Sequence, residues 1–192
     1  MAKEKKKFNL STLFLFLGGL LLLIKFIIGG GIPSPSTNIF EFLVGLFVAL
    51  VIIAFYFIFL FGVKNYSLTI RIFAPSVLIL ILFGNYSVNF INETVTGIFS
   101  IFTKLSMLLM ILTDFVFLFL KNKILGYVFF ISSVVYGTII FSSAITVSIY
   151  DAVNSNAFNY MNFIIASILA VAVVLLGLGI YFIIRNKKLL DI

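Results

Sequence analysis

The chain contains no cysteine, no histidine and no tryptophan, and only three prolines among its 192 residues. Without cysteine it can form neither a disulfide nor a thiolate nucleophile or metal site. Without histidine it lacks the commonest general base and metal ligand. No G-x-S-x-G elbow or H-E-x-x-H motif occurs either. We therefore expect no enzyme activity, no metal and no cofactor; an intramembrane enzyme is the weaker alternative, with a lone carboxylate or amine as its base.

Charge is also scarce, whereas apolar residues are abundant. Only 10% of the residues are charged, 63% are hydrophobic, and the mean hydropathy is +1.30. A soluble domain with this composition would expose large apolar patches, so the lipid bilayer is the expected solvent and partner. The net charge of +7 fits contact with anionic headgroups. Nucleic acid is not expected as a partner, because no contiguous basic face lies outside the apolar segments.

Six apolar segments are long enough to cross a hydrocarbon core about 30 Å thick, which takes ~20 residues. We predict an all-α integral membrane protein, a bundle of six transmembrane helices with no soluble domain, forming a single domain over residues 1–192. Pro75 interrupts the third segment, which either spans with a kink or is re-entrant. The predicted helices cover residues 10–28, 39–62, 67–84, 95–119, 124–149 and 160–184.

Lys and Arg residues between these segments fall only in alternate gaps, and the gaps between them hold none. Basic residues resist translocation, so the basic gaps and both termini are predicted to be cytoplasmic, and the third segment to span. The first segment is too long for a signal-peptide core and no small-residue cleavage site follows it, so we expect it to remain as a helix. The predicted location is the plasma membrane of a bacterium. The basic residues at these edges are Lys3, Lys5, Lys6, Lys7, Lys64, Arg71, Lys121, Lys123, Arg185, Lys187 and Lys188.

The segment 95–119 carries a polar stripe. At about 100° per residue, six side chains fall within a strip roughly 80° wide, and the opposite face is wholly apolar. The stripe could line a binding site or permeation path, or it could be a packing face in which hydroxyls bond to backbone carbonyls. Its members are Thr96, Ser100, Thr103, Met107, Met110 and Asp114.

Two charges lie on or beside this stripe. Lys104 lies on its shoulder and Asp114 near its cytoplasmic end; at 1.5 Å per residue they are about 15 Å apart and cannot pair. Lys104 either lines a cavity or extends to the outer headgroups, and Asp114 either lies in a site or meets Lys121 at the interface.

The predicted topology places Lys104 in the same leaflet as Lys25, Glu41 and Glu93. These four could surround an outward-facing cavity. Alternatively, Glu41 caps the second helix, Glu93 and Asp151 are loop residues, and Lys25 extends to the headgroups. The candidate ligand-binding or pathway residues are Lys104, Asp114, Thr103, Ser100, Lys25 and Glu41.

Small residues recur at helical spacing in the other segments, which predicts close helix packing. The segment 124–149 has such residues on two flanks, so we expect it in the middle of the bundle. One flank holds Ser133, Gly137, Ala144 and Ser148, and the other holds Thr138, Ser142 and Thr146. Similar seams are formed by Gly18 in the first segment, Gly45 and Ala49 in the second, and Ala166, Ala170 and Gly177 in the last.

The predicted function is membrane transport, as a small permease or as the membrane-embedded substrate-binding subunit of a transport complex. No Walker-type or other nucleotide-binding motif occurs, so the chain is not expected to be an ATP-driven motor by itself. In size and predicted span number it resembles the substrate-capture subunits of energy-coupling-factor transporters, although no motif residue supports that resemblance. The alternative is a non-catalytic scaffold or accessory subunit. A small-molecule ligand and other membrane subunits are the possible partners.

The absence of cysteine makes the predicted sidedness directly testable. A single Asn85→Cys variant should react in intact cells with a membrane-impermeant maleimide, because the gap holding Asn85 is predicted to face outward. Asn122→Cys, between the two lysines of an inner gap, is the control and should react only after permeabilisation. Shielding of Asn85→Cys in intact cells would show that the topology is inverted.

Overall fold

The computed structural model describes residues 10–29, 39–40, 42–44, 46–47, 50, 88–120, 122–155, 158 and 160–185. The described residues contain no strand, and those at 39–40, 42–44, 46–47 and 50 are helical. Of the long helices, α4, α5 and α6 are long and apolar enough to cross a membrane, whereas the apolar part of α1 is shorter. The long helices are α1 (Leu10–Ile28), α4 (Glu93–Phe119), α5 (Lys123–Ser155) and α6 (Tyr160–Arg185).

The all-helical class and the apolar helices suited to a membrane are thus as predicted. The helix over 10–28 has the predicted bounds, and α4 and α6 differ from prediction by one or two residues. Most of the predicted helix 39–62 and all of 67–84 lie outside the described residues, as do Pro75 and most of the basic residues predicted to be cytoplasmic. The number of spans and the positions of the termini therefore stay predictions.

The start of α4 is set by a cap. The Asn92 side chain accepts hydrogen bonds from the backbone N–H groups of Thr94 (2.9 Å) and Val95 (3.3 Å). These bonds satisfy two donors that the first turn of a helix leaves unpaired. Glu93 occupies this first turn, where its negative charge interacts favourably with the positive end of the helix dipole. Glu93 is therefore part of the helix, and its prediction as a loop residue is corrected.

The end of α5 also differs from the prediction, since the helix continues to Ser155 instead of ending at residue 149. Residues 150–155 contain neither proline nor glycine, so none of these residues prevents the helix from continuing. Asn154 donates a hydrogen bond to the carbonyl of Tyr150 at 3.0 Å, within the same helix. Asp151 accordingly lies in the last turns of α5, not in a loop.

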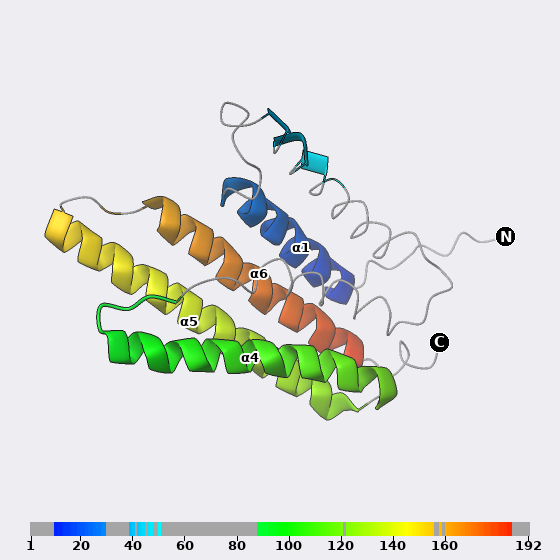
Figure 1. The fold of residues 1–192 in the computed structure, drawn as a ribbon. Helices are drawn as coiled ribbons and strands as arrows, with labels where there is room; N and C mark the ends of the chain where they lie inside the picture. The colour runs from blue at the N-terminus through cyan, green and yellow to red at the C-terminus, as the bar shows by residue number, and fades with distance from the viewer. Residues whose placement is uncertain are drawn as a thin grey trace.

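The four helices pack in the order α4, α5, α6, α1, with α5 and α6 in the middle (Figure 1). Neighbours in this order run antiparallel, so the start of α1 and the end of α6 lie at the same end of the bundle as the end of α4 (Figure 1). Among the described helices, α5 lies between α4 and α6, as expected for a central helix. Of its two predicted flanks, only the one with Ser133 and Gly137 packs there, since Thr138 and Ser142 are exposed. The alternation of direction fits the alternating charge pattern of the sequence.

Close backbone approach defines both faces of α6. Against α1, a Cβ added at Gly18 would lie 3.0 Å from the Ala172 carbonyl oxygen, and one at Gly179 would lie 2.8 Å from Leu15 Cγ. Contacts this short leave no space for a side chain, so α1 and α6 meet backbone to backbone. The predicted small-residue seam on the first helix is therefore observed.

The contact between α6 and α5 is of the same kind. A Cβ at Gly177 would overlap the Ser133 side chain, and one at Gly137 would lie 3.0 Å from the carbonyl oxygen of Ala170. The seam predicted on the last segment and the flank of Ser133 and Gly137 on the segment before it are thus packing faces. The seam at Gly45 and Ala49 falls outside the described residues.

Aromatic rings gather at both ends of the bundle. At one end the Tyr181 ring lies 5.0 Å from the Tyr127 ring and 5.7 Å from the Phe130 ring, and Arg185 donates a hydrogen bond to the Tyr181 hydroxyl at 3.1 Å. At the other end Phe158 lies 4.7 Å from Tyr160. Amphipathic rings favour the headgroup region, so these clusters mark the two ends of a membrane-spanning bundle.

Before α4, residues 88–90 form a non-helical strap that folds back along α5. The Ser143 hydroxyl accepts from the Asn89 N–H at 3.0 Å and donates to the Asn89 carbonyl at 2.7 Å. The Thr96 hydroxyl pairs in the same way with both backbone groups of Phe90, at 2.8 and 3.0 Å. Two hydroxyls thus satisfy four backbone groups, which a non-helical segment at membrane depth requires.

The Gly177 contact predicts a steric effect on stability. Gly177→Val should lower the free energy of unfolding by about 1–3 kcal/mol, because the added side chain overpacks the interface with Ser133. Thermal unfolding of the purified protein in detergent would measure this loss. Gly97→Val is the matched control, since nothing lies within 4 Å of a Cβ at Gly97. Equal stability of the two variants would contradict the described interface.

The strap predicts a local effect on hydrogen exchange. Ser143→Ala should speed deuterium exchange at the Asn89 amide and cost about 1–3 kcal/mol, because it leaves both backbone groups of Asn89 unsatisfied. Thr146→Ala is the control: that hydroxyl donates to the Ser142 carbonyl within its own exposed helical turn. Unchanged exchange at Asn89 in the Ser143→Ala variant would disprove the described strap.

Candidate functional site

The polar stripe of α4 is turned inward, against α5. Thr103, Met110 and Asp114 are buried, and Thr96, Ser100 and Met107 are half-buried. The opposite apolar face is exposed along its length, as predicted for a lipid-facing surface. Its exposed members are Ile98, Phe99, Ile101, Phe102, Leu105, Leu109 and Leu112.

The buried arc of α4 is displaced from the predicted stripe. Two hydroxyl residues that the sequence reasoning did not select, Ser106 and Thr113, are each 5% exposed and lie inside the arc. On a helical wheel they fall about 60–80° from Thr103, on the side opposite Lys104. Ser106 follows Thr103 by three residues, and Thr113 follows Met110 by three and Ser106 by seven. This helical spacing was a sequence signal for the buried face. The consequence is that Lys104, placed on the shoulder of the stripe, is exposed.

Two buried hydroxyls on this face of α4 bond within their own helix. Thr103 donates to the Phe99 carbonyl at 2.7 Å, and Thr113 donates to the Leu109 carbonyl at 2.6 Å. Such bonds to the carbonyl four residues earlier are the common way in which an apolar interior accommodates Thr. For these two residues the geometry favours the packing interpretation of the stripe.

Asp114 differs from the hydroxyls because it carries a full charge into the same interface. Its side chain is only 3% exposed, although it lies within two turns of the end of α4. Placement of a carboxylate within the membrane costs on the order of 2.5–3.5 kcal/mol by insertion scales. Its partner Lys121, predicted as one alternative, lies outside the described residues. Asp114 is the predicted site residue that the fold encloses most completely.

The face of α5 turned toward α4 adds more polar groups. Ser132 and Ser143 are buried on this flank, away from the contacts with α6. Ser148, which lies on the other flank with Ser133 and Gly137, is also fully buried, and its hydroxyl has no hydrogen-bond partner in the described part of the chain. The predicted second flank, by contrast, is largely exposed, since Thr138 and Ser142 face outward. The interface between α4 and α5 therefore contains several buried polar side chains, among them the carboxyl group of Asp114.

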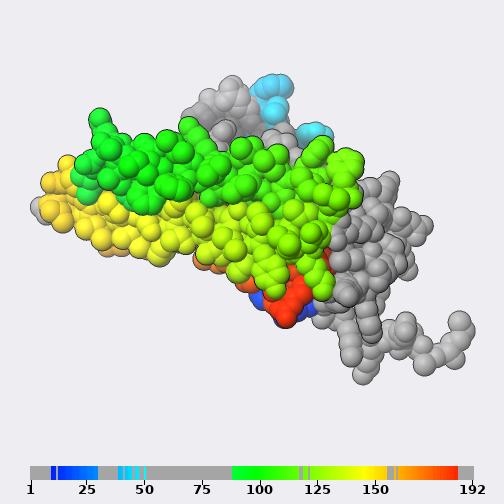
Figure 2. Space-filling view, turned by 90° about the horizontal axis from the view of Figure 1, so that it is seen from below, coloured from blue at the N-terminus to red at the C-terminus, as the bar shows by residue number. Residues whose placement is uncertain are grey.

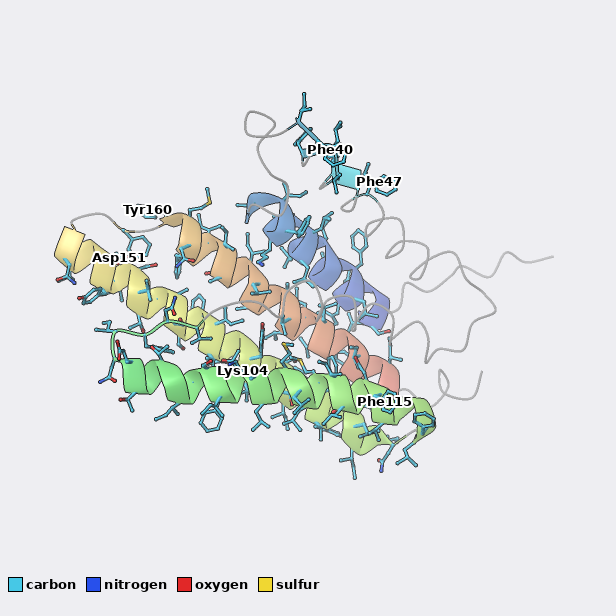
Figure 3. All side chains as sticks on the ribbon, in the orientation of Figure 1. Phe40, Phe47, Lys104, Phe115, Asp151 and Tyr160 are labelled. Carbon is cyan, nitrogen blue, oxygen red and sulfur yellow. The ribbon has the colours of Figure 1, made fainter. Side chains whose placement is uncertain are left out.

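The other predicted charges lie elsewhere. Lys25 is half-buried on the face of α1 that packs on α6, whereas Lys104 lies near the middle of α4 (Figure 3). These two helices are separated by α5 and α6 in the packing order. Glu93 is exposed at the start of α4, and Glu41 lies outside the described residues. The described helices do not bring Lys25 and Lys104 onto one interface, and the four-charge cluster stays a prediction.

Comparison with protein-family models, curated proteins and solved structures found no match to this chain. Among the described residues, no group of three or more His, Cys, Asp or Glu side chains could hold a metal ion. The function is therefore argued from the geometry of the helices alone.

Proposed function

We propose that this chain is a membrane transport protein, either a small permease or the membrane-embedded substrate-binding subunit of a transport complex. The single observation that carries the proposal is the enclosure of Asp114 in the polar interface of α4 and α5. An ionisable residue inside a membrane bundle is costly, and such residues mark substrate and ion pathways. Packing accounts for the hydroxyls of the stripe, but an apolar residue would pack there at lower cost than a carboxylate.

The proposal includes the topology predicted from the sequence. The chain forms a single domain of six transmembrane helices with both termini in the cytoplasm of a bacterium, and it lies in the plasma membrane. The alternating direction of the four described helices and their aromatic ends support this arrangement. Asp114 then lies in the cytoplasmic half of the bundle, because α4 runs inward.

A scaffold or accessory subunit is the second candidate, and one observation favours it. The hydroxyls of Thr103 and Thr113 are bonded within α4, and the stripe is packed against α5. A subunit that only holds a partner needs such packed interfaces and no ligand. The two candidates differ in what Asp114 does: in the first it contacts a ligand or coupling ion, and in the second it stabilises the bundle.

The test uses the full chain, purified in detergent and then reconstituted in liposomes. A panel of small metabolites and inorganic ions is screened by thermal shift, and compounds that stabilise the protein are measured for uptake. Asp114→Asn, which keeps the shape and removes the charge, should lower binding or uptake at least about tenfold, since the loss of one desolvated charge contact costs roughly 2–5 kcal/mol. Glu93→Gln removes an exposed charge from the same helix and is the control.

Full uptake by a folded Asp114→Asn protein would contradict the proposed role of this residue. A protein that binds no compound of the panel, that co-purifies with a membrane partner in mild detergent, and that Asp114→Asn merely destabilises, would favour the scaffold.

A further inference from the structure

Lys104 is a lone cation on the lipid-facing side of α4. It is exposed, and its ammonium group makes no hydrogen bond or ion pair within the described residues. Its neighbours on this face are apolar and open, Ile101 being 67% and Leu108 50% exposed. In Figure 2, α4 lies beside α5, and the outward face of α4 is uncovered along the helix. The amine is therefore carried by an apolar surface near the middle of a helix suited to span a membrane.

Among the described residues, no carboxylate lies at this depth. Glu93 and Asp114 lie about 16 Å and about 15 Å along the α4 axis from Lys104, and Asp151 lies near the far end of α5 (Figure 3). The other three acidic residues of the sequence are Glu4, Glu41 and Asp191. Residues 42–92 contain no Asp or Glu at all, so whichever part of them packs near α4 adds no counter-charge.

A second copy of the chain does not solve the problem either. Two copies with the same topology lie at the same depth in a bilayer, and a two-fold contact through α4 would bring Lys104 against the Lys104 of the other copy. A like-charge pair in a low-dielectric medium is repulsive. The exposed face of α4 around Lys104 is thus complementary to an apolar surface of another molecule that carries a negative charge.

We infer that the exposed face of α4, centred on Lys104 and including Ile101 and Leu108, docks a membrane-spanning helix of a different protein that carries an Asp or Glu at the depth of Lys104. The pair is a charge-assisted hydrogen bond formed inside the bilayer, and the apolar residues around it pack against the partner helix. The inference does not depend on transport, because it uses the exposed surface around Lys104, about 80° around the helix from the buried Asp114.

The test is site-specific photo-crosslinking of the full chain in its native membrane. A benzoyl-phenylalanine is placed at Ile101 or Leu108, with Val171 of α6, which is 51% exposed, as the control position. We expect one membrane protein to be captured from the two α4 positions and not from Val171. Its yield should fall roughly tenfold in Lys104→Gln and Lys104→Glu. Lys104→Arg should retain it, and Lys123→Gln, which removes a charge elsewhere, should have no effect.

A charge exchange then decides whether the captured protein binds as inferred. Replacement of the partner's intramembrane Asp or Glu by Lys should abolish capture by the natural chain and restore it with Lys104→Glu. Failure of this rescue would overturn the inference. Crosslinks only to lipid, only to residues 51–87 of the same chain, or only to a second copy would also overturn it, as would a protein captured equally well by Lys104→Glu.

Discussion

The close approach of α6 to its two neighbours depends on positions that carry little or no side chain. Gly18 and Gly179 bring α6 against α1, and Gly177 and Gly137 bring it against α5. In lipid no hydrophobic force distinguishes one helix contact from another, so dispersion between closely packed backbones has to hold the bundle together. These close contacts join α1, α6 and α5, and α4 packs on α5.

The contact between α4 and α5 contains several buried polar side chains. The face of α4 turned to α5 contains hydroxyls that bond within their own helix, together with one enclosed carboxylate, Asp114. The strap at residues 88–90 strengthens the same contact, because Ser143 of α5 and Thr96 of α4 hold two adjacent residues of it. Several polar side chains and the carboxyl group of Asp114 thus lie at the interface between α4 and α5.

Hydropathy and spacing predicted much of this arrangement, because lipid imposes a simple rule on each helix. The bounds of α1, the apolar outer face of α4 and the seams of α5 and α6 all follow from periodicity. The end of α5 could not be predicted in this way, since Asp151 and Asn154 suit both a turn and an exposed helical end. The predicted stripe is rotated about the helix axis from the buried face by about 50°, half of the turn per residue. The prediction therefore left out Ser106 and Thr113 and placed Lys104 at the edge of the site. The spacing of residues along a helix does not say which face packs against a neighbouring helix. For this reason the sequence could not predict that Asp114 is buried and Lys104 is exposed.

The length of α5 has a practical consequence. Its 33 residues extend about 50 Å, whereas the hydrocarbon core is about 30 Å thick and a typical tilt of about 20° shortens the projection only slightly. Roughly 15 Å of continuous helix must stand in the headgroups or in water. A protein this small offers little for image alignment in electron microscopy, and the projecting part of α5 is a natural graft point for a rigid fiducial helix.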